Sequence, residues 1–384
     1  MIGRRIAASA VLVVAVSVTT SCHAFDATSP GEPRAAHVIW QVALPALGPP
    51  AFDDSTVYFS LRTHLIVAVN RASGSVRWFG GSGLGGSSLT VEETPVRATD
   101  VVVFGDWNLT AFDAKTGAFR WVFGDQFSGD GPGLYMFQTD GTTIYTGSAT
   151  GGAFALDAAS GRLLWRVDLV PGKGNQVRAY AVRDGRVYLT VRHNGLRFAG
   201  RVYVLDARTG ATIWSYELPR ADGSPNGTNG IVLCQSGTGR RLVVVSFDDG
   251  RIAALDAADA TVQWTIAARS IQNDDRNMAA AAGILIASGL SPDVVDAYDL
   301  ETGAMRWEMS STQGSVEIGP GHVSADSSVA RVNFTNGVIG TYDLRTGALR
   351  DLLRAPTSFF TNTPVGDRGA YFLGGWDHAF AIRL

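Results

Sequence analysis

The sequence predicts an all-β fold, an eight-bladed β-propeller of four-stranded antiparallel blades, and three observations carry this prediction. A turn motif followed by Trp recurs along the chain every 43 to 50 residues, which is the period of a four-stranded propeller blade. Short stretches of alternating apolar and polar residues surround each copy, as in half-buried strands. A strand-like segment ahead of the first copy can supply the fourth strand that the last blade lacks.

The recurring motif is Asp, two residues, Thr or Ser, Gly, three residues and Trp, as in Asp113, Thr116, Gly117 and Trp121. The Asp can accept hydrogen bonds from backbone N–H groups two or three residues later. The Gly supplies the positive φ that closes a hairpin, and the Thr adds a hydroxyl bond. The Trp can wedge its indole between neighbouring sheets with the N–H satisfied. We expect this structural docking role for Trp40, Trp78, Trp121, Trp165, Trp214, Trp264 and Trp307.

Two copies lack the Gly or the Trp of the motif. The fifth has Asp259 and Ala260 where Thr and Gly are expected, and the seventh has Asp351 in place of Trp. If a docking pocket exists at the seventh junction, introducing Trp at position 351 should be neutral or stabilising.

The segment around the second copy predicts one complete blade. Strand A is expected near residues 95–96, strand B at 101–105, strand C at 109–113 and strand D at 118–123, an antiparallel meander. Seven copies then imply eight blades. Residues 38–44 resemble an isolated strand D, and residues 370–384 supply strands B and C and then stop. We expect the N-terminal strand to join the C-terminal blade, which closes the ring and removes its exposed edges.

The first 22 residues predict a signal peptide of the lipoprotein type. Arg4 and Arg5 precede an apolar run of 13 residues at 6–18, too short for comfortable membrane spanning and typical of an export signal. Cys22 follows small residues, as at a lipidation site, although Thr19 departs from the usual Leu. The alternative is an ordinary cleavable signal that ends near Ala24. Residues 23–36 then predict a flexible tether, and residues 37–384 the propeller.

This pattern resembles the PQQ-like propeller repeats of bacterial quinoprotein dehydrogenases and of the outer-membrane assembly lipoprotein BamB. The resemblance covers roughly residues 38–384 and rests on the seven repeats. It implies the propeller fold and the docking role of the Trp residues. It implies function less strongly, because one fold hosts many activities.

The sequence lacks the motifs expected for nucleic-acid binding, for common cofactor and metal sites and for common hydrolase active sites. The net charge of −3, from 32 basic and 35 acidic residues, argues against nucleic-acid binding. The two cysteines, Cys22 and Cys234, are far apart, whereas PQQ enzymes resembling this chain use an adjacent Cys pair. The GxGxxG match at residues 81–86 is not followed by a helical pattern, as a dinucleotide site requires. No HExxH, GxSxG or metal-ligand spacing is present. We therefore expect no cofactor, with PQQ as the alternative.

What remains is a surface. In a propeller, the D–A connections and the B–C turns lie at one face, around the central channel. Exposed aromatic residues with a few charges suit protein binding; the alternative is that several of the aromatics plug the channel or pack between blades. The candidate partner-binding residues are Trp107, Phe127, Tyr135, Arg178, Asp248, Asp249, Phe359, Phe360 and Trp376.

The sequence therefore favours a non-enzymatic scaffold lipoprotein of the cell envelope, facing the periplasm or the cell exterior. Its expected partners are other envelope proteins, among them members of an outer-membrane protein assembly system. It would contact the membrane through the lipid anchor alone. We expect a monomeric propeller that does not bind nucleic acid. The alternatives are an enzyme, either a divergent PQQ-dependent quinoprotein or a hydrolase, and a propeller that binds a small ligand or polysaccharide.

Overall fold

The computed structural model describes the chain from residue 33 to its end in fifteen segments. The predicted signal peptide, including Cys22, and residues 23–32 of the predicted tether lie outside them. No helix in these segments is long and apolar enough to cross a membrane. The described segments are 33–63, 65–81, 95–106, 108–124, 134–170, 175–193, 200–223, 226–268, 278–288, 294–310, 323–326, 328–334, 337–357, 365–367 and 369–384.

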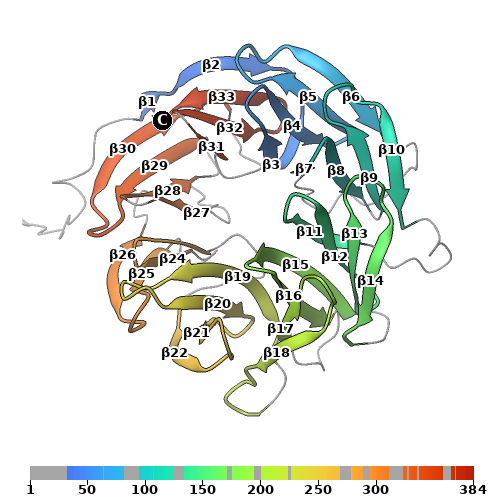
Figure 1. Ribbon diagram of the computed structural model, residues 1–384. Helices are drawn as coiled ribbons and strands as arrows, with labels where there is room; N and C mark the ends of the chain where they lie inside the picture. The colour runs from blue at the N-terminus through green and yellow to red at the C-terminus, as the bar shows by residue number, and fades with distance from the viewer. Residues whose placement is uncertain are drawn as a thin grey trace, which may run out of the picture.

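The described strands form eight sheets that circle a common centre, each built on four antiparallel strands (Figure 1). Blade 1 consists of β3 (Ala46–Phe52), β4 (Thr56–Leu61), β5 (Leu65–Asn70) and β6 (Val76–Gly81). Blade 2 consists of β7 (Val96–Ala98), β8 (Val101–Asp106), β9 (Asn108–Asp113) and β10 (Phe119–Phe123). Blade 3 consists of β11 (Leu134–Thr139), β12 (Thr143–Ser148), β13 (Gly152–Asp157) and β14 (Leu163–Asp168). Blade 4 consists of β15 (Asn175–Arg183), β16 (Arg186–His193), β17 (Arg201–Asp206) and β18 (Thr212–Glu217).

The remaining blades complete the ring. Blade 5 consists of β19 (Thr228–Gln235), β20 (Arg241–Phe247), β21 (Arg251–Asp256) and β22 (Val262–Ala267). Blade 6 consists of β23 (Met278–Ala281), β24 (Ile284–Ser288), β25 (Val294–Asp299) and β26 (Met305–Ser310). Blade 7 consists of β27 (Val323–Ala325), β28 (Val329–Asn333), β29 (Val338–Asp343) and β30 (Leu349–Arg354). Blade 8 consists of β31 (Val365–Asp367), β32 (Ala370–Gly374), β33 (Ala379–Arg383) and β2 (His37–Val42). The predicted eight-bladed, all-β fold is confirmed.

The outer strand of each blade shows why the sequence alternates there. In blade 1, β4 is buried at every position because its two faces meet neighbouring blades. The outermost strand β6 buries Trp78 and Gly80 and exposes Arg77 and Phe79. One face of an outer strand therefore packs on the next blade, while the other faces solvent.

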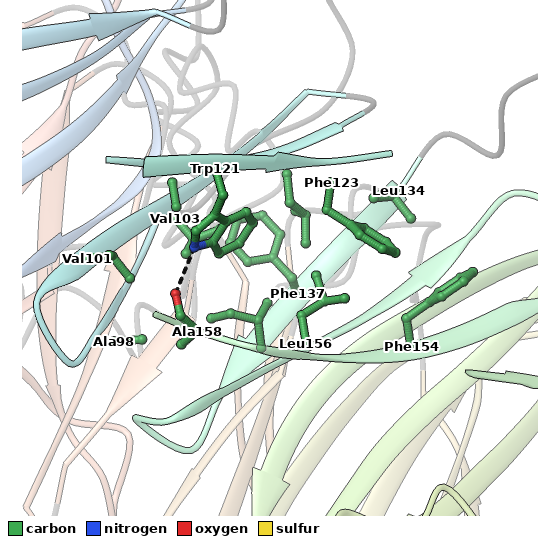
Figure 2. Close-up of a cluster of buried hydrophobic side chains, with 13 residues drawn as sticks. Ala98, Val101, Val103, Trp121, Phe123, Leu134, Phe137, Phe154, Leu156 and Ala158 are labelled. Carbon is green, nitrogen blue, oxygen red and sulfur yellow. Dashed lines mark hydrogen bonds between the residues drawn. The ribbon is translucent and has the colours of Figure 1, made fainter. Parts of the chain in front are cut away.

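In seven of the eight blades, the Trp of the outer strand contacts the turn motif of the following blade. Trp121 of blade 2 donates its indole N–H to the carbonyl of Ala158 in blade 3, 2.9 Å away (Figure 2). Its ring lies in a buried cluster with Val103, Leu156 and other apolar side chains. All seven bonds span 2.8–3.2 Å and reach the residue after the motif's first position, namely Arg71, Ala114, Ala158, Ala207, Ala257, Leu300 and Leu344.

The Gly of the motif is required both by its backbone and by the indole above it. Gly161 has a φ of 69°, and a Cβ there would lie 2.6 Å from Cδ2 of Trp121. At the fifth copy, Ala260 takes this position with a φ of 65°. Its N–H still bonds the Asp256 carbonyl at 3.0 Å. The turn therefore forms without Gly, although the left-handed backbone conformation of Ala260 costs an L-residue roughly 1–2 kcal/mol.

The N-terminal strand closes the ring as predicted. Strand β2 pairs antiparallel with β33, with Val42 opposite Ala379 and Trp40 opposite Ala381. In Figure 1 the blue strand β2 lies along the red strand β33. Trp40 then docks on blade 1, where its N–H reaches the Arg71 carbonyl. The guanidinium of Arg71 also forms an ion pair with Asp367 of blade 8.

The chain enters the ring through a short strand that the sequence did not predict. Strand β1 (Arg34–Ala35) pairs parallel with the outer strand β30 of blade 7. The N–H of Ala36 then bonds the Arg354 carbonyl at 2.8 Å. The last residues of the segment expected to be a tether therefore belong to the propeller.

The position of β1 explains why position 351 has no Trp. A docking Trp there would need the C–D turn of blade 8, but strand C (β33) and strand D (β2) of that blade are not consecutive in the chain. Strand β1 lies at this junction, and Arg34 Nη2 pairs with Asp351 Oδ2 at 2.6 Å. The pocket that would make Trp favourable at position 351 is therefore not formed, and we expect Trp there to be destabilising.

Candidate partner-binding face

The B–C turns and the D–A connections lie at the same end of the blades, because consecutive strands in each blade are antiparallel. This end is called the partner-binding face below. Of the residues predicted for it, Trp107, Phe127, Phe359 and Phe360 lie outside the described residues. Tyr135 lies in β11, and its side chain is also outside them.

The remaining predicted residues fall into two places on the ring. Arg178 lies on β15 of blade 4, and Asp248 and Asp249 lie in the β20–β21 turn of blade 5. Trp376 lies in the β32–β33 turn of blade 8. The sequence prediction therefore combined two separate groups, one at the junction of blades 4 and 5 and one beside blade 1.

Asp249 is held as an ionised carboxylate by its neighbours. Arg251 Nε lies 2.7 Å from Asp249 Oδ2, and the Arg251 backbone N–H bonds Oδ1 at 3.1 Å. Burial alone would raise the pKa of Asp249, but hydrogen bonds from the backbone N–H and the guanidinium of Arg251 outweigh it and lower that pKa. Its charge is therefore already paired within blade 5.

Asp248 differs, because part of its carboxylate is buried against backbone. A Cβ at Gly227 would lie 2.0 Å from Asp248 Oδ2, so this approach requires Gly. The Asp248 N–H bonds the Gly227 carbonyl at 3.0 Å. Its Oδ1 is buried and accepts no hydrogen bond from any described residue. Such a carboxylate is costly unless something supplies a donor.

The start of β19 and the residues just before it fasten blade 5 to blade 4. The Gly200 N–H bonds the Asn226 carbonyl at 2.7 Å, and Thr228 Oγ1 lies 3.3 Å from the Val191 carbonyl. The Tyr180 hydroxyl of β15 donates to the Asn229 carbonyl. The Asn229 side chain is fully buried and has no partner among the described residues. This junction therefore concentrates buried polar groups at the partner-binding face.

Arg178 faces the same junction from blade 4. Its Nη2 donates to Gln176 Oε1 at 3.3 Å along the same strand. Arg178 is half-buried, so it can present only part of its guanidinium to a partner.

The second group is a stacked pair that includes a residue missed by the sequence prediction. Trp376 is 55% exposed, and Arg62 Cζ lies 3.2 Å from the centre of its ring. Arg62 occupies the β4–β5 turn of blade 1. Ring closure makes blades 8 and 1 neighbours, so pairing their B–C turns was the signal that could have found Arg62.

The described residues contain no cluster of metal-ligating side chains. No three His, Cys, Asp or Glu side chains among them gather closely enough to hold a metal ion. Cys234 lies in β19, and burial raises the pKa of its thiol to about 12. A thiol with that pKa stays protonated at neutral pH and is a poor nucleophile.

Comparisons with known proteins agree with the fold and point to several functions. A family model described as outer membrane protein assembly factor BamB matches residues 24–157, 106–217 and 149–384. Tetrathionate hydrolase from Acidithiobacillus ferrooxidans is 24% identical over 302 residues, covering 68% of this chain and 57% of that protein. BamB from Yersinia pestis is 26% identical over 238 residues, covering 58% and 57%.

Two further matches show the range of relatives. The dehydrogenase subunit of a quinone-type alcohol dehydrogenase from Gluconobacter oxydans is 33% identical over 29% of this chain and 16% of that protein. The crystal structure of BamB from Moraxella catarrhalis matches with a TM-score of 0.66 and 16% identity, over 91% of this chain and 100% of that chain.

The matches thus include enzymes and an assembly factor on the same propeller. The chain spans less than two thirds of the length of the sequence relatives given above. The family model, in contrast, matches from residue 24 to the end of the ring. The chain belongs to the PQQ-like propeller family described as outer membrane protein assembly factor BamB.

Proposed function

We propose that this protein is a non-enzymatic scaffold lipoprotein of the cell envelope, which binds other envelope proteins through the partner-binding face and takes part in outer-membrane protein assembly. The observation that carries the proposal is the family match over the whole ring. BamB from Yersinia pestis is named an outer membrane protein assembly factor, and the same role is proposed here for this chain.

The chemistry of the face supports protein binding. It presents an exposed Trp stacked on Arg at one junction and a polar group of Arg178, Asp248 and Asp249 at another. Trp and Arg dominate binding energy in protein interfaces. The outer strands offer exposed apolar side chains as well, but these are spread over the outer surface of several blades.

The test is photo-crosslinking in the native envelope. A benzophenone amino acid replaces Trp376 or Asp248 on the partner-binding face, and Lys115 in the β9–β10 turn at the opposite end serves as the matched control. We expect crosslinks to an envelope protein from positions 376 and 248 and none from position 115. Equal crosslinking from position 115, or none from any position, would contradict the proposal.

Anchoring is tested separately. Two acyl chains on Cys22 would give stable membrane attachment, so the wild-type protein should enter the detergent phase after phase separation. Cys22→Ser should remain soluble or uncleaved. A wild-type protein found in the aqueous phase would show that Cys22 is not lipidated.

The second candidate is an enzyme, favoured by the match to tetrathionate hydrolase over 68% of this chain. A PQQ enzyme fits less well, because the chain lacks an adjacent Cys pair and the described residues lack a metal-binding cluster. Absorbance of the purified protein after incubation with PQQ and Ca²⁺ separates the quinoprotein from the scaffold, and release of products from tetrathionate tests the hydrolase. Either positive result would favour the enzyme.

A further inference from the structure

The stacked pair Arg62–Trp376 joins two neighbouring blades on the partner-binding face. The Arg62 guanidinium carbon lies 3.2 Å from the centre of the Trp376 ring, while Trp376 remains 55% exposed. The guanidinium therefore covers one part of the indole, and about half of the Trp376 surface is exposed to solvent. In cation–π contacts, Arg is the more frequent cation and Trp is the best aromatic partner, so this pair is a favourable combination.

Both side chains are carried by braced turns. The Arg62 N–H bonds the Pro45 carbonyl at 3.0 Å, and the Gly375 N–H bonds the His378 carbonyl at 2.7 Å. A Cβ at Gly375 would lie 2.8 Å from Thr357 Oγ1, so the turn also packs closely on the connection after blade 7. The pair is thus held in place before any partner arrives, and less conformational entropy is lost when a partner binds.

No described residue accepts a hydrogen bond from the guanidinium of Arg62. Within the part of the chain that the structure describes, Arg62 makes no side-chain hydrogen bond and no ion pair; its contact is the stack on Trp376. The neighbouring acid, Asp377, instead approaches His378, with Oδ2 3.0 Å from Nδ1. A stacked guanidinium still presents N–H donors in its plane, where they match the two oxygens of a carboxylate.

We propose that Arg62 and Trp376 form an anchor for a carboxylate of a partner protein. A Glu or Asp side chain would accept two hydrogen bonds from Arg62, and an apolar side chain beside it would cover the exposed indole. A singly charged carboxylate fits better than a doubly charged phosphate, because Asp377 adds negative charge nearby. This inference rests on the proposed function, since it names the partner chemistry of the same face.

The test is a titration followed by NMR on the whole ¹⁵N-labelled protein. The indole N–H resonance of Trp376 is assigned by its loss in Trp376→Phe. The probe is the peptide acetyl-Gly-Leu-Glu-Leu-Gly-amide, and its Gln counterpart is the matched control. We expect a saturable shift with the Glu peptide and binding about tenfold weaker with the Gln peptide, because hydrogen bonds to charged groups are the stronger ones. Equal binding of both peptides would overturn the proposal.

Three variants locate the effect. Arg62→Ala should abolish the shift, and Arg62→Lys, which keeps the charge without the planar fork, should weaken binding several-fold. Arg77→Ala should bind as wild type does, because Arg77 lies on the outer strand β6, away from the stack. Unchanged resonances of the other indoles show that each variant is folded. Undiminished binding by Arg62→Ala, or a larger shift with inorganic phosphate than with the Glu peptide, would contradict the proposal.

The two proposals fail in different ways. If Arg62→Ala still crosslinks to the envelope partner as strongly as wild type, the carboxylate anchor is wrong and the scaffold function stands. If the wild-type protein crosslinks to nothing, the scaffold function is wrong, and the peptide titration shows whether the anchor exists.

Discussion

Replacing the docking Trp121 tests the contacts that hold neighbouring blades together. Trp121 is 7% exposed, its ring covers Gly161, and its N–H bonds the Ala158 carbonyl at 2.9 Å. Truncating a buried Trp to Ala costs about 3–5 kcal/mol. The carbonyl left without its donor accounts for about 1 kcal/mol of such a loss. We therefore expect Trp121→Ala to lower the free energy of unfolding by about 4 kcal/mol.

The assay is urea unfolding, followed by circular dichroism, with two comparison variants. Trp121→Phe keeps most of the apolar contact but loses the N–H, so it should cost about 1–2 kcal/mol. Trp165 is only half-buried, so Trp165→Ala should cost less than Trp121→Ala. A loss below about 1 kcal/mol for Trp121→Ala would show that the indole does not hold the blades together.

Three further predictions follow from the departures in the motif and from its charges. Ala260→Gly should stabilise the protein by about 0.5–1 kcal/mol in the same assay, because it relieves the positive φ at a smaller entropic cost; a destabilised variant would contradict this. Asp351→Trp should destabilise the protein by roughly 1–3 kcal/mol, since β1 occupies that junction. Asp351→Asn loses only the ion pair with Arg34 and should cost less than about 1 kcal/mol. A stabilised Asp351→Trp variant would show that a docking pocket for Trp exists there after all. The guanidinium of Arg120 and the hydroxyl and N–H of Thr116 hold the pKa of Asp113 below its ordinary value, so its contribution to stability is present above about pH 4 and lost as the pH falls below it. Asp113→Asn should therefore be less stable than wild type at pH 7, and the difference should shrink steadily as the pH falls below about 4; a difference that does not change with pH would contradict this.

The repeat made most of the fold predictable. Most copies of the motif identify a turn, its positive-φ residue and its docking Trp, so the repeat located seven blades, and the strand-like segment at residues 38–44 indicated the eighth. The expected strands of the second blade agree with β7 to β10 within about two residues. The missing turn motif after β33 predicted that β2 would complete blade 8, which is confirmed.

The features that escaped prediction depend on contacts outside the repeat. Strand β1 is two residues long and pairs with a strand more than 300 residues away, and so short a segment carries no periodic pattern. The absence of Trp at position 351 looked like a defect of the seventh copy, although it follows from where the chain enters the ring. Arg62 had no signal of its own, because its role appears only when blades 8 and 1 are placed side by side.

The central claim is that this chain forms one ring of eight blades, closed by its own N-terminal strand, and the most direct test is a disulfide across that closure. Val42 lies opposite Ala379 in the β2–β33 pair. We expect Val42→Cys combined with Cys at position 379 to form an intramolecular disulfide in the folded monomer, and a scan of positions 380 to 383 to crosslink less. Free thiols at every register, or disulfides only between two chains, would contradict the closed ring.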